Sequence, residues 1–203
     1  MHEVQPYASL DDATKALDNG GRFYNFFSKA GDDAITPAEL RKVAGAFGND
    51  RTASLFFSLA TWNLGDADQR KLDTLLEPDT RALLDTHQPE LFTPTSFQGD
   101  AETGKPAIVE GEVRVVDDET ETGMILVPLM INNVTTMQVI PTANHYMVYQ
   151  VGDGPRCHVL TPKRAEPLSG TIRFGGVVKE SPPEETGNPS PGPRLEAAFF
   201  STL

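Results

Sequence analysis

The sequence predicts an α+β protein in which an N-terminal all-α helical bundle is followed by a small antiparallel β-barrel or sandwich. Residues 1–88 carry apolar side chains at helical spacing between capping residues, whereas residues 107–180 form short apolar or alternating runs that are typical of strands. We therefore expect a helical domain at 1–88, a linker at 89–106, a β domain at 107–180 and a proline-rich tail with an apolar end at 181–203. An OB-like barrel is one option for the β domain.

The first helices are bounded by recognisable start and stop signals. Ser9 is the predicted cap of a helix that stops at Gly20-Gly21, and the aromatic run at 22–29 predicts a short second helix. The clearest helix spans 36–48. There, Thr36 and Glu39 form a capping box around a first-turn proline, and a glycine ends the helix.

Three more helices complete the predicted bundle. One runs from Thr52 to Gly65, the next is capped by Asp66 with Gln69 three residues later, and the last begins at Pro78. Five or six short helices joined by tight turns are typical of a compact bundle.

The β domain is predicted from five or six segments within about 75 residues. Residues 107–117 alternate in polarity, and the continuous apolar run at 122–131 predicts a strand that is covered on both faces. Pro141 indicates a bend or an edge in the following strand, and Gly175-Gly176 is a candidate β-bulge.

The C-terminal segment has two interpretations. Residues 181–194 are rich in proline and predict an extended spacer, after which the chain becomes apolar again. The apolar end is either a tethered docking motif for a protein partner or a last strand that returns to the sheet, and we favour the strand. The anchors of the docking motif would be Leu195, Phe199, Phe200 and Leu203.

Charge and composition limit the possible partners and compartments. The net charge of −12 is spread evenly over both halves, which disfavours nucleic acid as a partner. No apolar stretch reaches the ~18 residues that span a bilayer, so we expect no membrane insertion. The N-terminus lacks the pattern of a signal peptide, and the single cysteine, Cys157, fits a reducing compartment. A cytoplasmic location follows as an expectation.

Residues 22–48 resemble an EF-hand, with entering aromatics, a central Ile35, Glu39 at the last loop position and an apolar exiting helix. The resemblance implies calcium ligands at Ser28, Asp32 and Glu39. However, Ala30 stands at a ligand position and Asp33 stands where the family has glycine. The resemblance therefore implies a degenerate, calcium-free loop, and we expect no cofactor.

No catalytic motif is present, and we favour a protein that is not an enzyme. The leading hypothesis is a binding or scaffold protein that contacts a protein partner, while its oligomeric state is not indicated. One alternative is a small-molecule-binding or enzymatic β-barrel, and a second is a calcium-regulated switch that uses the EF-hand-like loop. The candidate ligand-binding side chains of the first alternative are His145, Tyr146, Tyr149, His158 and Arg173.

Overall fold

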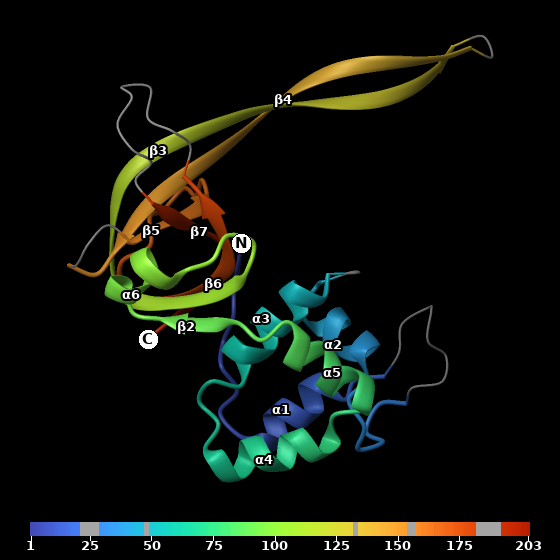
Figure 1. Ribbon diagram of the computed structural model, residues 1–203. Helices are drawn as coiled ribbons and strands as arrows, with labels where there is room; N and C mark the ends of the chain where they lie inside the picture. The colour runs from blue at the N-terminus through green and yellow to red at the C-terminus, as the bar shows by residue number, and fades with distance from the viewer. Residues whose placement is uncertain (21–28, 47–48, 132–133, 154–156, 182–191) are drawn as a thin grey trace.

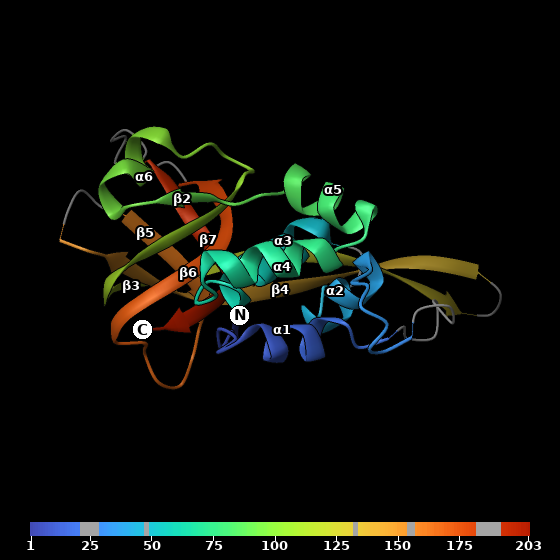
Figure 2. The same cartoon turned by 90° about the horizontal axis from the view of Figure 1, so that it is seen from below.

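The computed structural model describes residues 1–20, 29–46, 49–131, 134–153, 157–181 and 192–203. Within these ranges it contains six helices and seven strands, so the chain is α+β as predicted (Figure 1). Five helices lie together on one side of the sheet (Figure 2). None of the described helices has the length and hydrophobicity needed to cross a membrane.

The helices are α1 (Leu10–Leu17), α2 (Pro37–Val43), α3 (Asp50–Ala60), α4 (Asp66–Leu75), α5 (Pro78–Thr86) and α6 (Pro94–Asp100). Two predicted caps are confirmed. The Ser9 side chain accepts a hydrogen bond from the Asp12 N–H, and Thr36 and Glu39 form the reciprocal capping box of α2.

Several predicted helix boundaries were wrong, including the ends of α1 at Leu17 and of α3 at Ala60. Helix α2 ends at Val43, because Gly45 takes a positive φ of 64° that ends the helix earlier. Helix α3 begins at Asp50 with Asn49 as its cap. The cap of α4 is Gly65, which leaves Asp66 as the first helical residue. Most of the helix predicted at 22–29 lies outside the described residues.

The strands are β1 (His2–Glu3), β2 (Glu90–Phe92), β3 (Pro106–Ile131), β4 (Val134–Val151), β5 (Cys157–Pro162), β6 (Gly170–Glu180) and β7 (Pro193–Thr202). Pairing runs from β3 to β4, β5, β7 and β6 and returns to β3, so these five strands form a closed circuit. The expected antiparallel sheet is in fact mixed, because the β5–β7, β1–β7 and β2–β3 pairs are parallel. The predicted bulge is confirmed by a register shift between Gly175 and Gly176.

Separate clusters of buried side chains fill the helices and the sheet. The helical cluster includes Leu17, Ile35 and Leu40, and the sheet cluster includes Tyr149 and Phe174. A third cluster joins the two parts by packing α3 against β3, β7 and the residue that follows β1, and its members are Val4, Leu55, Leu59, Ala60, Ile108 and Phe199. The helical part is therefore fixed to the outside of the sheet by apolar contacts.

The two segments expected to be irregular contain secondary structure where they are described. Residues 89–106 hold β2 and α6, and α6 places Phe97 in the sheet core with no exposed surface. Residues 193–202 form β7, which pairs with β5, β6 and β1. The chain end thus follows the strand interpretation that the sequence favoured.

A buried arginine lies at the junction of helices and sheet. The Arg173 guanidinium, on β6, lies 3.8 Å from the ring centroid of Trp62, just after α3. Its Nε donates a 2.8 Å hydrogen bond to Glu110 on β3, while the side chain of Arg173 is only 5% exposed. A guanidinium is costly to bury without a carboxylate partner, and Glu110 supplies that partner from within the sheet. The contact with Trp62 is what links the buried arginine to the helical part.

We expect Glu110→Ala to lower the free energy of unfolding by about 2 kcal/mol, because it leaves the buried Arg173 guanidinium without its carboxylate. Urea unfolding measures this change. The matched control is Asp118→Ala, whose exposed pair with Lys163 is worth less than about 1 kcal/mol. Equal losses in the two variants would contradict a special role for the Arg173–Glu110 pair.

Candidate interaction site

Strands β3 and β4 continue far beyond the rest of the sheet as a two-stranded ribbon. Strand β6 pairs with β3 only as far as Val113, and β5 pairs with β4 only from Tyr146 onward. Between these points the two strands pair with each other, from Asp118–Met147 up to Ile131–Val134. Figure 1 shows this ribbon, which we call the arm (residues 117–147), projecting away from the sheet.

The arm has two faces, because residues directly opposite each other in an antiparallel pair project to the same side. One face carries the pairs Met124–Pro141, Leu126–Val139 and Pro128–Met137. Together with Met130 these side chains form what we call the methionine face. The opposite face carries Ile125–Ile140 and Val127–Gln138.

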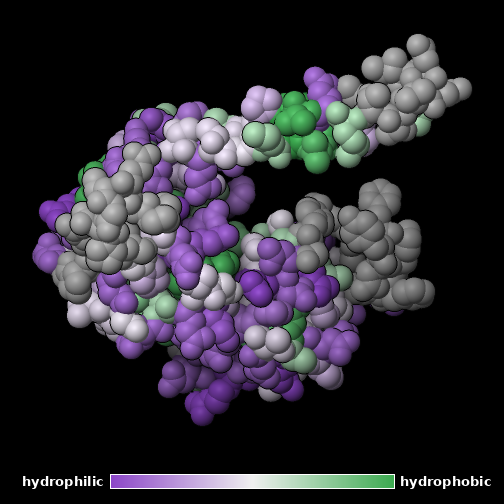
Figure 3. Space-filling view, turned by 45° about the horizontal axis from the view of Figure 1, so that its top comes forward, coloured by the Kyte–Doolittle hydropathy of each residue, from purple (hydrophilic) through white to green (hydrophobic). Residues whose placement is uncertain are grey.

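Large apolar side chains on the arm are exposed to solvent. The exposed fractions are 80% for Met124, 53% for Ile125, 59% for Leu126, 76% for Met130, 60% for Met137, 51% for Val139 and 41% for Ile140. They amount to roughly 800 Å² of apolar surface over the two faces. Five of them lie on the methionine face and expose roughly 600 Å² before its two prolines are counted, which is at the upper end of the ~300–600 Å² of the largest patch on a typical monomer. Figure 3 shows hydrophobic residues gathered on the arm, while most of the remaining visible face is hydrophilic.

The same part of the arm carries no charge. Residues 122–144 contain no Asp, Glu, Lys or Arg, although charged residues make up 23% of the sequence. A solvent-exposed ribbon normally keeps charged side chains to prevent association. Their absence, together with the exposed apolar surface, identifies the arm as the candidate interaction site.

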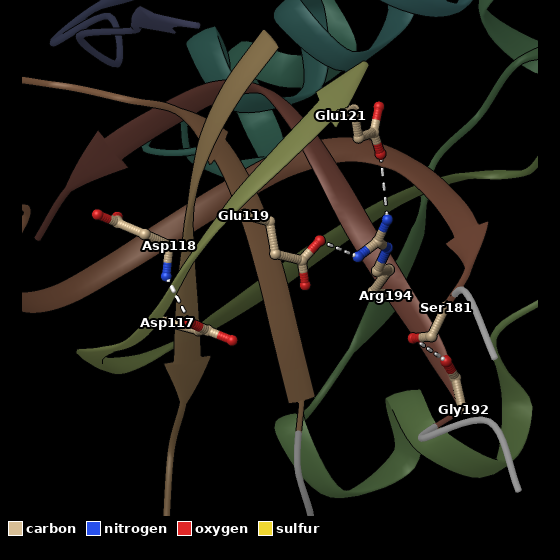
Figure 4. A network of polar contacts seen from close by, with 7 residues as sticks. All are labelled: Asp117, Asp118, Glu119, Glu121, Ser181, Gly192 and Arg194. Carbon is tan, nitrogen blue, oxygen red and sulfur yellow. Dashed lines mark hydrogen bonds and ion pairs between the residues drawn. The ribbon is translucent and has the colours of Figure 1, made fainter. Parts of the chain in front are cut away.

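The base of the arm is tied to the sheet by ion pairs. Arg194, at the start of β7, donates to Glu119 at 2.6 Å and to Glu121 at 3.2 Å (Figure 4). The Arg194 side chain is 9% exposed. Lys163, just after β5, binds Asp118 on the same strand β3 at 2.7 Å. These contacts fix the direction of the arm and compensate much of the negative charge at its base.

The structure does not bring the five candidate ligand-binding residues together. Tyr149 is fully buried in the sheet core, where its hydroxyl accepts a hydrogen bond from the Leu168 N–H. Arg173 is committed to Glu110 and Trp62, as described above. His145 is exposed on the arm beside Thr120, Tyr146 is half-buried there, and His158 is half-buried on β5. The described cavities are lined by other residues.

The residues proposed as anchors of a C-terminal docking motif are mostly inside the sheet. Leu195 has no exposed surface, Phe199 is 3% exposed and Phe200 is 2% exposed, whereas Leu203 is 57% exposed. A partner reaches the first three only if β7 leaves its neighbours. Most of the exposed large hydrophobic side chains described in the structure lie instead on the arm, which the sequence did not single out as a site.

The EF-hand-like loop uses its carboxylates to hold its own backbone. Glu39 is fully buried, and its two oxygens accept hydrogen bonds from the N–H groups of Gly20 and Thr36 and from the Thr36 hydroxyl. Asp18 accepts from the N–H groups of Gly31 and Asp33 in the same way. Asp32 is exposed, and Ser28 lies outside the described residues. A calcium ion would have to displace these bonds to use Glu39.

Two adjoining cavities lie on the helical part, around Phe57 and between α3, α4 and α5. The larger, of about 410 Å³, also touches Trp62 and Leu91, and the smaller, of about 280 Å³, touches Arg81. No cluster of three or more potential metal-ligating side chains occurs in the described part of the chain. Asp73 lines both cavities, and Asp85 lies with Arg81 beside the smaller one.

No protein-family model matches the chain, and no curated protein matches it.

We expect calcium to leave the thermal stability unchanged, because Glu39 is already fully hydrogen-bonded. A site with a dissociation constant near 10 μM would add about 2.7 kcal/mol at about 1 mM calcium, which is a shift of several degrees in Tm. Thermal unfolding in calcium and in excess EGTA, with magnesium as the control, measures this. A rise in Tm that is specific to calcium would show that the loop opens to bind the ion.

Cys157 is predicted to be unreactive in the native protein. Burial raises the pKa of its thiol to about 12, so the reactive thiolate is scarce near pH 8.5, where an unfolded cysteine is about half ionised. Iodoacetamide should modify the native protein slowly and the urea-unfolded protein rapidly, as followed by intact mass. Rapid modification without urea would show that β5 opens readily.

Proposed function

We propose that this protein is a non-enzymatic binding or scaffold protein that contacts a protein partner through the arm. The observation that carries the proposal is the exposed apolar surface described on the arm, within a stretch, residues 122–144, that contains no charged residue. An apolar patch of this size on an otherwise acidic chain is typical of a protein–protein interface. The apolar run was expected to be covered on both faces, and within the described chain it is not covered.

The rest of the fold acts as the platform that holds the arm. The closed circuit of β3, β4, β5, β7 and β6 supports a small barrel, and the helices α1–α5 support a bundle packed on its outside. Since β3 and β4 belong to both the circuit and the arm, the platform sets where the arm points. Arg194 and Lys163 add polar contacts at the base.

Site-specific photo-crosslinking tests this function. A benzoylphenylalanine in place of Met137 should crosslink the full chain to a discrete protein in cells that express it, and mass spectrometry identifies the captured protein. The control position is Lys71 on α4, which is exposed but lies on a polar helix face. Absence of any protein adduct at Met137, or equal adducts at both positions, would contradict binding through the arm.

A further inference from the structure

We propose that the occupant of the methionine face is the methionine face of a second copy of this chain, so that two arms pack face to face around a two-fold axis. The inference rests on the proposed function and names its partner. It depends on four features of the arm: blocked edges, a self-complementary face, a sufficient area and a contact zone without charge.

The outer edges of the arm are poorly suited to pairing with another strand. Pro128 and Pro141 both lie on the methionine face, and a proline fits within a sheet only where its missing N–H would point away from the neighbouring strand. Each outer edge therefore lacks a hydrogen-bond donor near its middle, Pro128 on β3 and Pro141 on β4. Proline at an edge opposes strand addition, so a partner should approach the face of the ribbon instead.

The methionine face has the chemistry of a surface that matches itself. From Met124 to Met130 on one strand and from Met137 to Pro141 on the other, the side chains on this face are methionine, leucine, valine and proline, which offer nothing for a partner's charge to complement. Two-fold interfaces place the same patch on both sides, so this apolar part of the face meets an identical one without an unpaired charge. The unbranched side chains of Met124, Met130 and Met137 adapt to fill the space between two ribbons.

The area fits a stable dimer. The methionine face exposes roughly 700 Å² per chain, and two buried faces come close to the ~1,600 Å² total of a standard protein interface. Face-to-face ribbons separated by about 10 Å would exclude water from both sets of methionines.

The arm also separates the acidic bodies of two copies. Each chain carries a net charge of −12, which disfavours close approach. The charge-free part is about ten residues long on each strand, or roughly 33 Å at ~3.3 Å per residue, whereas charges are screened over about 8 Å at physiological ionic strength. Two arms that pack along this part with their bases at opposite ends therefore keep the acidic bodies apart and avoid most of the repulsion. The ion pairs of Arg194 and Lys163 reduce the charge at the base further.

Sedimentation velocity of the full chain from roughly 1 to 100 μM tests the proposal, since standard-size interfaces have dissociation constants of micromolar or tighter. The wild-type chain should sediment as a dimer at the upper end of this range. Val139→Lys places a positive charge on the methionine face. Because each chain of a two-fold dimer contributes this face, the interface would then contain two such charges. The substitution should weaken the dimer at least ~100-fold. Leu126→Lys, opposite Val139, should do the same.

The control is Ile140→Lys, which makes the same change one residue away on the opposite face, where Ile140 is 41% exposed. This variant should remain a dimer. All three positions are exposed, so each variant should keep the Tm of the monomeric fold in dilute solution. A wild-type chain that stays monomeric up to about 100 μM, or a dimer that Ile140→Lys weakens as much as Val139→Lys, would overturn the proposal.

Crosslinking at Met137 separates this inference from the proposed function. A monomeric chain whose arm is crosslinked to a different protein overturns the second copy as occupant and leaves binding through the arm intact. A monomeric chain with no adduct at Met137 overturns both.

Discussion

The arm depends on a single physical constraint: a two-stranded ribbon with apolar side chains on both faces has no interior of its own. An isolated hairpin is marginally stable in water, because three or more strands or a packed helix are needed to cover an apolar face. Here β3 and β4 are held as strands by the circuit at one end, and Arg194 braces the point where they leave it. Beyond that point the ribbon keeps its shape through cross-strand pairs alone, and contact with another chain would supply the missing cover.

The apolar contacts between the helices and the sheet support the strands from which the arm projects. Gly175 on β6 lies so close to α3 that an added Cβ would come within 2.9 Å of Leu59 Cδ1, and Phe199 packs into the same joint. A closely packed helix layer stiffens the strands that carry the arm, because packed interiors deform little. The helical part thus has a structural role in supporting the sheet.

Local sequence signals predicted the local features of the fold. The caps at Ser9 and Thr36, the first-turn proline of α2 and the bulge at Gly175-Gly176 each depend on a few neighbouring residues, and each was found. The start of α4 was misassigned because Gly65 and Asp66 are both acceptable caps, and only the backbone geometry separates them. The parallel pairing of β5 with β7 depends on residues far apart in sequence, which no local pattern encodes.

The candidate site was missed for a related reason. The run at 122–131 was predicted as a strand with two covered faces, and its strand pairing was found. The sequence does not indicate whether the residues that cover these faces belong to the same chain or to another. In addition, the acidic segment 117–121 interrupts the apolar pattern, so the strands before and after it were not predicted to be one continuous β3. The available signal was the charge-free stretch 122–144, which is too long for the interior of a small sheet.

Hydrogen–deuterium exchange of the full chain at low and high protein concentration tests the central claim most directly. If the arm is covered by a second chain, exchange of amides within 122–144 should slow as the concentration rises, while exchange in the helical core around Leu40 and in the sheet core around Phe174 should stay constant. Arm amides that exchange at the same rate at every concentration would contradict self-association through the arm.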